Sequence, residues 1–380
     1  SEEDFMKPIE WIDDLKIRGG YGIMGNQLNV GSANGYTTYG QNRSHSFYDI
    51  KGSSSSTVQG FQRQRIGNPD AKWESNINSN IGLDATLFGG QLEITVDYYN
   101  KVIKDLLFGL PLAAVVGQGT VPAVNVAEMS NKGLDLSIYG EKQITSNFKL
   151  NATATFTSYN NKLNKLAEGI DYFEQEGRRF NGANIVRNQV GQSIGSFFGY
   201  DIAGFWNSQA EIDAANNSIR EKSGNEEALY QSDVAVGRFR YSDINGDGQV
   251  TADDRTFLGN PSPKFSYGLN IGANYKNFDF GIFFYGVQGN DIWNQLKWWH
   301  DFNPNFQGAK SYTALNDSWT PQNMNAKAPI QETKGSFSTT DVPNSYYIEN
   351  GSYLRAKNAQ IGYVLPTALV NKLKVDRVRV

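Results

Sequence analysis

Side-chain oxygens recur at regular spacing between Asp243 and Asp254, and this is the most specific chemical pattern in the sequence. They stand at the first, third, fifth, ninth and twelfth positions of the stretch, and Gly246 stands at the sixth, where a sharp turn is needed. Ca²⁺ prefers several hard oxygens in a flexible arrangement. The spacing therefore predicts a structural calcium site, with these ligands: Asp243, Asn245, Asp247, the Gln249 carbonyl, Thr251 and Asp254.

Two features of the same stretch favour another interpretation. Asp254 occupies the twelfth position, where a bidentate Glu is usual, so the expected ligand number or affinity falls. An Asn-Gly-Asp-Gly sequence also forms tight turns without any metal. In either case the stretch is expected to hold a long loop in shape and to take no part in catalysis.

Aromatic residues form a second set of candidates, because flat rings can stack on sugar rings or on peptide side chains. The predicted substrate-binding residues are Trp298, Trp299, His300 and Trp206. Other aromatic residues accompany them in the same two stretches: Trp293, Phe197, Phe198, Tyr200 and Phe205. The alternative is that these rings pack inside long loops or form an aromatic girdle at a membrane interface.

Residues for bond chemistry are scarce. The chain has two histidines and no cysteine, and it lacks a nucleophile elbow, so the common acyl-transfer arrangements have no support. Carboxylate pairs such as Glu93 and Asp97 fall within alternating stretches and are expected to line a wet surface. A net charge of −4 and a pI near 5.4 also argue against nucleic-acid binding. The sequence predicts a protein that is not an enzyme.

The elements that must position these residues alternate apolar and polar side chains with a period of two, which is typical of β-strands with one apolar and one wet face. Leu83, Ile94, Leu136 and Ile271 mark the apolar positions of four such stretches. A membrane-spanning strand needs apolar residues only at alternate positions, so a mean hydropathy of −0.50 is compatible with it. Near the end of the chain the apolar phase shifts, which predicts a β-bulge near Asn358.

The links between these stretches alternate in length. Short turns are expected at 88–91, 142–147, 276–277 and 366–375, and long loops at about 26–71, 107–130, 159–261 and 287–350. Short links therefore lie at one end of the strands and long links at the other, as in outer-membrane barrels. The predicted fold is all-β: residues 1–380 form part of one antiparallel transmembrane β-barrel, with roughly nine strands in this chain.

Several motifs, in order along nearly the whole chain, resemble the C-terminal barrel of SusC/RagA-family TonB-dependent transporters. The most extended of them is the Gly-rich aromatic stretch 190–206, followed by 237–242 and the acidic loop. The remaining motifs are 97–100 with 104–107, 131–133, 259–264, 319–323, 351–355 and 362–366.

The resemblance implies a barrel of about 22 strands in the outer membrane of a Gram-negative bacterium, with its long loops extracellular. It implies active import of a bulky oligosaccharide or oligopeptide, a SusD-like surface lipoprotein as partner, and TonB as the source of work. Outer-membrane lipid would surround the barrel. The plug domain and the TonB-contacting segment of that family are absent from this sequence, so the chain is expected to be a central-to-late piece of a longer polypeptide.

Two rival functions remain open at the level of sequence. A passive or secretion-associated outer-membrane barrel would share the strands but lack a plug. A soluble calcium-dependent scaffold or adhesion module would account for the acidic loop, although modules of the dockerin type carry two such loops and this sequence has one.

Overall fold

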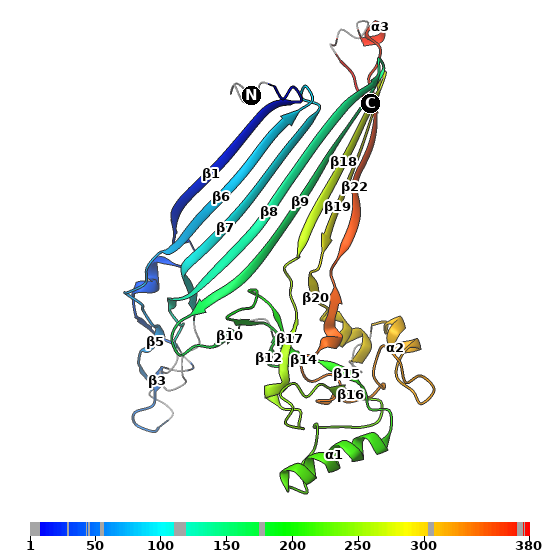
Figure 1. Ribbon diagram of the computed structural model, residues 1–380. Coiled ribbons are helices and arrows are strands. Elements are labelled where there is room, and N and C mark those ends of the chain that lie inside the picture. Colours follow the sequence, from blue (N-terminus) through cyan, green and yellow to red (C-terminus); the bar gives the residue numbers. More distant parts are fainter. Residues whose placement is uncertain are drawn as a thin grey trace.

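A computed structural model describes residues 8–28, 30–42, 44, 46–53, 57–109, 119–174, 179–302, 308–370, 375 and 377–380. Its main element is an eight-stranded antiparallel sheet whose strands lie side by side and tilt in the same sense (Figure 1). In spatial order the strands are β1 (Ile12–Asn26), β6 (Glu74–Leu87), β7 (Leu92–Gly109), β8 (Ala123–Thr145), β9 (Phe148–Leu166), β18 (Phe265–Tyr275), β19 (Phe278–Gln288) and β22 (Tyr353–Tyr363).

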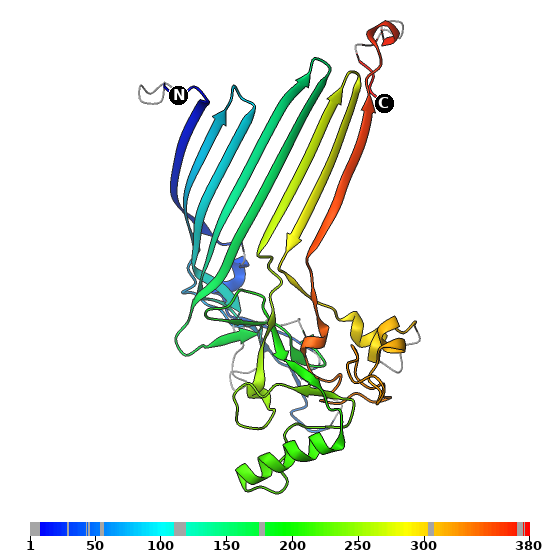
Figure 2. The ribbon, with the colours of Figure 1, turned by 45° about the vertical axis from the view of Figure 1, so that its right-hand side comes forward.

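The two ends of the sheet differ sharply. Tight turns at 88–91, 146–147 and 276–277 join neighbouring strands at one end, where β1 begins and Val380 also lies (Figures 1 and 2). Phe88, Gly89 and Gly90 have φ values of 59°, 68° and 80°, and Lys276 has a φ of 52°, which are the left-handed conformations that tight hairpins require. All the long links lie at the other end, so the predicted separation of short and long links is confirmed.

The register places one apolar row across the sheet. Ile17 of β1 lies opposite Leu83 of β6, and the row continues through every strand to Leu354 of β22. Its members in order are Ile17, Leu83, Val96, Leu136, Phe156, Tyr267, Gly286 and Leu354. Neighbouring positions form polar rows, for example Lys16, Asp84, Thr95, Ser137 and Thr155. One face of the sheet is therefore apolar and the other is polar.

The apolar face is not the core of a closed globule. Ile17 is 74% exposed, Ile81 58% and Ile361 73%, and no element of the described chain covers them. Leu83, Ile94, Leu136 and Ile271 are all exposed or half-exposed. A continuous exposed apolar face across eight strands requires an apolar surrounding, and hydrocarbon supplies it.

The bulge expected near Asn358 is present. Phe283 pairs with Asn358, but the next pair is Phe284 with Ala356, so Lys357 is the extra residue. The pairing of Val364 with Arg379 shows that residues 378–380 begin a ninth strand beside β22. The link expected at 366–375 contains helix α3 (Thr367–Val370), and its remainder lies mostly outside the described residues.

Strands β7, β8 and β9 extend further than the alternation predicted, so the loop expected at 107–130 is only the link between Gly109 and Ala123, of which 110–118 lie outside the described residues. At the loop end of these strands side chains are buried on both faces, and alternation therefore disappears. The buried cluster there consists of Leu106, Val126, Ala127, Leu163, Leu166 and Phe173.

Small two-stranded sheets fill the long links. The first link contains β2 (Thr38–Gly40) with β5 (Gln62–Arg65), and β3 (Phe47–Tyr48) with β4 (Val58–Gln59). The link after β9 contains β10 (Tyr172–Glu174) with β13 (Arg187–Gln189), β11 (Arg179–Phe180) with β12 (Ala183–Asn184), β14 (Phe197–Tyr200) with β17 (Arg255–Gly259), and β15 (Ile202–Phe205) with β16 (Phe239–Tyr241). The last link contains β20 (Asp291–Trp293) with β21 (Ile348–Asn350).

Helices are few and belong to the links. In α1 (Gln209–Ser223) the Ser208 side chain accepts a hydrogen bond from the Glu211 amide, and Gly224, with a φ of 66°, ends the helix. A short helix, α2 (Tyr312–Asn316), lies in the last link. None of the helices in the described ranges has the length and apolar character needed to cross a membrane.

The two faces predict different effects of charge at neighbouring positions on β8. Leu136→Arg should lower the free energy of unfolding by about 2–4 kcal/mol, because it places a charge in hydrocarbon near mid-strand. Ser137→Arg, one residue along on the polar face, should change it little. Denaturant unfolding of the full-length protein in lipid vesicles measures both. Equal destabilisation by the two variants would contradict the assignment of faces.

Candidate functional site: a loop cap at one end of the sheet

The two longest links, 167–264 and 289–352, fold together into a cap at the loop end of the sheet (Figure 1). Two buried clusters draw side chains from both links. The first contains Phe180, Ile185, Val186, Phe197 and Tyr347, with Trp293, Trp298 and Phe302 packed against it. The second contains Tyr200, Phe239, Tyr241 and Val250, with Phe205, Phe337 and Tyr346 packed against it. The rings of each link are thus buried by the other.

A buried polar joint fixes the relative position of the two links. The side-chain amide of Gln231 donates to the Phe239 carbonyl at 2.8 Å and to the Ser338 hydroxyl at 2.7 Å, and its oxygen accepts from the Tyr241 amide at 2.8 Å. Asn344 donates to the Tyr241 hydroxyl, which itself donates to the Phe337 carbonyl. Buried polar groups that are satisfied in this way specify one arrangement, because any slip leaves them unpaired.

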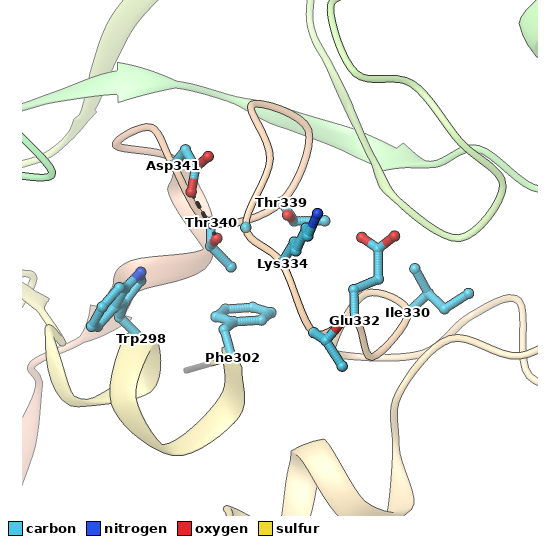
Figure 3. Close-up of a pocket in the computed structure, with 10 residues that line it drawn as sticks. Trp298, Phe302, Ile330, Glu332, Lys334, Thr339, Thr340 and Asp341 are labelled. Carbon is cyan, nitrogen blue, oxygen red and sulfur yellow. Dashed lines mark hydrogen bonds between the residues drawn. The ribbon is translucent and has the colours of Figure 1, made fainter. Parts of the chain in front are cut away.

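A cavity of about 270 Å³ opens within the last link (Figure 3). Trp298 and Phe302 form one side of it, and the segment 330–341 forms the other, with Glu332, Lys334 and Asp341 as its charged groups. Rings beside a few polar groups are the usual lining of a ligand site. The cavity could therefore hold a polar group of a ligand against the two aromatic rings.

The wall formed by the segment 330–341 holds two of its charged groups in place and leaves a third available. The guanidinium of Arg238 holds Glu332 in a fork, with Nη2 to Oε1 at 2.7 Å and Nε to Oε2 at 2.9 Å. The Thr340 hydroxyl donates to Asp341 at 3.1 Å. Lys334 is exposed and has no ion pair with any residue of the described chain. Its ammonium group is therefore available to an acceptor on a ligand.

The structure separates the four predicted substrate-binding residues into two places. Trp298 lines the cavity, Trp299 packs edge-on against it with ring centroids 4.7 Å apart, and the His300 ring nitrogen Nδ1 lies 2.9 Å from the Ala309 carbonyl oxygen. Trp206 is 2% exposed and packs edge-on against Tyr230. The ring of Trp206 therefore lies inside the cap, and its faces are covered in this structure.

Beside His300 lies a second cavity of about 370 Å³, which Asp301 and Tyr346 also line. The Tyr346 hydroxyl donates to Asp301 at 2.6 Å. Burial, reinforced by this hydrogen bond to a carboxylate, raises the pKa of Tyr346 well above its ordinary value. The hydroxyl consequently keeps its proton at any physiological pH and acts as a donor that holds Asp301 in place.

The acidic loop satisfies many of its carboxylates with its own backbone. Asp243 accepts from the amides of Gly246 and Gly248 at 2.7 and 2.8 Å, and the fully buried Asp254 accepts from the amides of Ile244 and Thr251 at 2.8 and 2.7 Å. Among the described residues, no three His, Cys, Asp or Glu side chains converge into a metal-binding group. The loop is ordered by these hydrogen bonds, and the calcium site stays a prediction.

The polar face of the sheet carries its own charged network. Arg18 donates to Asp84 at 2.6 and 2.9 Å and to Asp97, two strands away, at 2.9 Å. A Cβ at Gly82, which lies between them in the register, would come within 2.9 Å of the Arg18 Nη2 atom. Glycine at this position therefore gives the guanidinium room to reach both acids.

Sequence reasoning did not find the cavity residues Phe302, Glu332, Lys334 and Asp341. The segment 330–341 has no motif and no periodicity in sequence. It becomes a candidate for ligand binding only because it lines the same cavity as Trp298. Arg18 lies in an alternating stretch, and no local motif identifies its partners. Its partners, Asp84 and Asp97, lie 66 and 79 residues further along the chain, and only the register of three paired strands brings them to Arg18.

An antiparallel sheet with one lipid-compatible face, one polar face and all its long links at one end is the wall of a membrane-spanning β-barrel. Residues 9–223 match the family described as "TonB dependent receptor-like, beta-barrel". The chain belongs to this family of outer-membrane barrels. Its relatives are receptors and transporters, and the chain is accordingly not an enzyme.

Curated relatives match along essentially the whole chain. TonB-dependent receptor P26 of Formosa agariphila is 32% identical over 100% of this chain and 35% of its own length. TonB-dependent receptor SusC of Bacteroides thetaiotaomicron is 25% identical over 95% of this chain and 33% of its own length. The chain thus spans about a third of the length of these relatives.

A solved structure described as the RagAB peptide transporter has the same fold. It superimposes with a TM-score of 0.71 over 96% of this chain and 36% of its own chain, at 24% sequence identity. The "open-open" state of the RagAB peptide importer gives a TM-score of 0.72 at 23% identity, over 97% of this chain and 35% of its own. The SusC/RagA resemblance seen in the sequence motifs is confirmed.

The two tryptophan environments predict different effects of truncation. Trp298→Ala should weaken capture of a ligand by roughly 2- to 10-fold, because one stacking face is lost, and should leave the cap folded. Trp206→Ala should instead destabilise the cap by about 3–5 kcal/mol, because it empties a buried site. Titration calorimetry with soluble oligosaccharides and oligopeptides, together with hydrogen exchange of the cap, separates the two. Loosening of the cap by Trp298→Ala would show that this ring only packs.

Proposed function

We propose that this chain supplies part of the barrel wall and the loop cap of a TonB-dependent importer for a bulky nutrient. The observation that carries the proposal is a sheet with one exposed apolar face and one polar face along all eight strands. A folded cap that contains a cavity lies at one end of this sheet. Family membership supports energy from TonB. The long links face the cell exterior, where nutrient is first met, and the tight turns face the periplasm.

The cargo in this proposal is an oligosaccharide or an oligopeptide. Trp298 and Phe302 offer ring faces to either class, and Lys334 offers a donor to a hydroxyl, a carbonyl or a carboxylate. One solved structure of the same fold is described as a peptide transporter, and one relative is a SusC receptor. A SusD-like lipoprotein that closes over the cap is proposed from the sequence resemblance.

Of the two rival functions, the soluble scaffold fits the structure less well. A soluble scaffold would expose Ile17, Ile81 and Ile361 to water over a face eight strands wide, which favours aggregation. A passive barrel fits the sheet equally well, and only family membership distinguishes it. The decisive difference is the source of energy, because an open pore needs none.

Energy dependence is therefore the test of the proposed function. Cells that carry the full-length protein should accumulate a labelled member of an oligosaccharide and oligopeptide panel, and deletion of TonB or collapse of the proton-motive force should abolish the accumulation. Trp298→Ala should slow it. Deletion of the gene in the same background is the control.

Accumulation that persists without TonB would favour the passive barrel. Absence of any accumulation across the panel, with the protein present in the outer membrane, would contradict nutrient import by this receptor.

We also infer that the acidic loop binds a structural calcium ion through the ligands that the spacing predicts: Asp243, Asn245, Asp247, Gln249, Thr251 and Asp254. The sequence spacing supports this, since each carboxylate oxygen that accepts one amide hydrogen retains a lone pair. Asp254 is fully buried and holds the loop through its amide bonds. The bound ion would therefore stabilise this loop of the cap and would catalyse nothing.

Chelation tests this site. Removal of calcium with a chelator should speed hydrogen exchange of residues 237–260 and leave the barrel strands unchanged, because the ion would constrain only the loop. Asp247→Asn, which removes one ligand charge on an exposed turn, should require more calcium for the same protection. Identical exchange with and without chelator would show that amide hydrogen bonds alone order the loop.

A further inference from the structure

A groove of about 610 Å³ lies at the loop end of the sheet, where the pairing between β9 and β18 stops. The last pair is Ser158 with Phe265, and β9 then continues to Leu166 paired with β8 on its other side. The Ser158 hydroxyl donates to the Lys264 carbonyl at 2.9 Å and closes one end of this notch. Because β18 begins here, the lipid-facing side of the wall is indented at this level.

The groove is apolar on one side and cationic on the other. Tyr98, Leu134 and Phe156, all at lipid-facing positions of the register, line its apolar part. Lys132 and Lys264 line its other part, both exposed and without an ion pair in the chain as described. No acidic residue contributes to the lining. The groove therefore carries uncompensated positive charge beside exposed rings.

Its height in the membrane follows from strand β8. Lys132 and Lys142 lie ten positions apart on the same face of this strand, and Leu134, Leu136 and Ile138 alternate between them. Ten residues at about 3.3 Å each, tilted by about 40°, span roughly 25 Å along the membrane normal, which is the height of an outer-membrane apolar band. The two lysines consequently mark the two edges of that band.

We propose that the groove binds a phosphorylated glycolipid of the outer leaflet. Lys132 and Lys264 would pair with the headgroup phosphates, the nearby Asn160 and Ser262 would bond to its sugars, and Tyr98, Leu134 and Phe156 would contact its acyl chains. At the opposite edge of the apolar band, the pocket that Lys142 lines is also lined by Glu141. Of these two pockets, only the groove at the loop end therefore has lysines and no acidic residue in its lining. The inference rests on the proposed orientation, in which that end faces outward.

The test uses full-length protein extracted in mild detergent and exposed to lipid A as the probe. Native mass spectrometry should show lipid A retained by the parent protein. The double variant Lys132→Gln, Lys264→Gln should bind it roughly 30-fold more weakly, because each lysine near a charged lipid surface contributes about half of this loss in affinity. Lys142→Gln, on the same face of the same strand, should bind as the parent does. Dephosphorylated lipid A should not be retained.

Two results would overturn the proposal. Equal retention by the double variant and the parent would exclude the lysines, and equal binding of the acyl-free phosphorylated disaccharide would show an anion site that does not need lipid. Nutrient uptake by the double variant should be unchanged. Failure of the glycolipid proposal can therefore be distinguished from failure of the proposed import function.

Orientation is checked independently, because this chain contains no cysteine. Glu221→Cys on α1 should react with an impermeant maleimide on intact cells, and Ser146→Cys in the β8–β9 turn should not. The reverse labelling would contradict the proposed orientation itself, and with it the assignment of the groove to the outer leaflet.

Discussion

Backbone N–H and C=O groups find no water in hydrocarbon, and this constraint determines the architecture. Every residue of a membrane-spanning strand must pair with neighbours on both sides, and in this sheet the six strands from β6 to β19 have an antiparallel neighbour on each side. Because pairing consumes the backbone, side chains alone decide which face meets lipid. A one-residue slip would move the whole row from Ile17 to Leu354 onto the polar face, so the apolar pattern fixes the register.

The cap obeys a different constraint, since it lies beyond the sheet and must bury its own surface. Many of its rings are buried where the two links meet, and the joint around Gln231 and Asn344 holds the links in one arrangement. The Arg238–Glu332 fork ties the same links at the cavity edge. A rigid cap on a rigid wall can present Trp298 and Lys334 in a fixed geometry, which is what selective capture requires.

The sheet could be predicted because its information is local. Alternation over a dozen residues located the hairpins, and the phase shift near Asn358 located the bulge. Alternation fails at Leu106 and Leu107, which are adjacent and both buried, because the pairing with β8 shifts register at these residues and the cap residue Phe173 packs in the cluster that contains Leu106. A two-residue period of apolar side chains therefore indicates a strand with one face in lipid and one in water. The period disappears where both faces of the strand are buried by protein.

The candidate site could be predicted only in part. Trp298 was found because aromatic residues are visible in sequence, but nothing local distinguishes its cavity position from the buried position of Trp206. The partners of Trp298 come from a segment without a motif, about 30 residues further on. The Arg18 network likewise needs Gly82 to lack a side chain, a requirement that appears only when three strands are paired.

The central claim is that alternate side chains of each strand meet hydrocarbon and water. Nitroxide labels placed singly at positions 150–157 of β9, in the full-length protein in lipid vesicles, test it most directly by their accessibility to oxygen and to a water-soluble nickel complex. Leu150, Ala152, Ala154 and Phe156 should favour oxygen, and Asn151, Thr153, Thr155 and Thr157 should favour nickel. Accessibility that is uniform, or that lacks the two-residue period, would contradict the account.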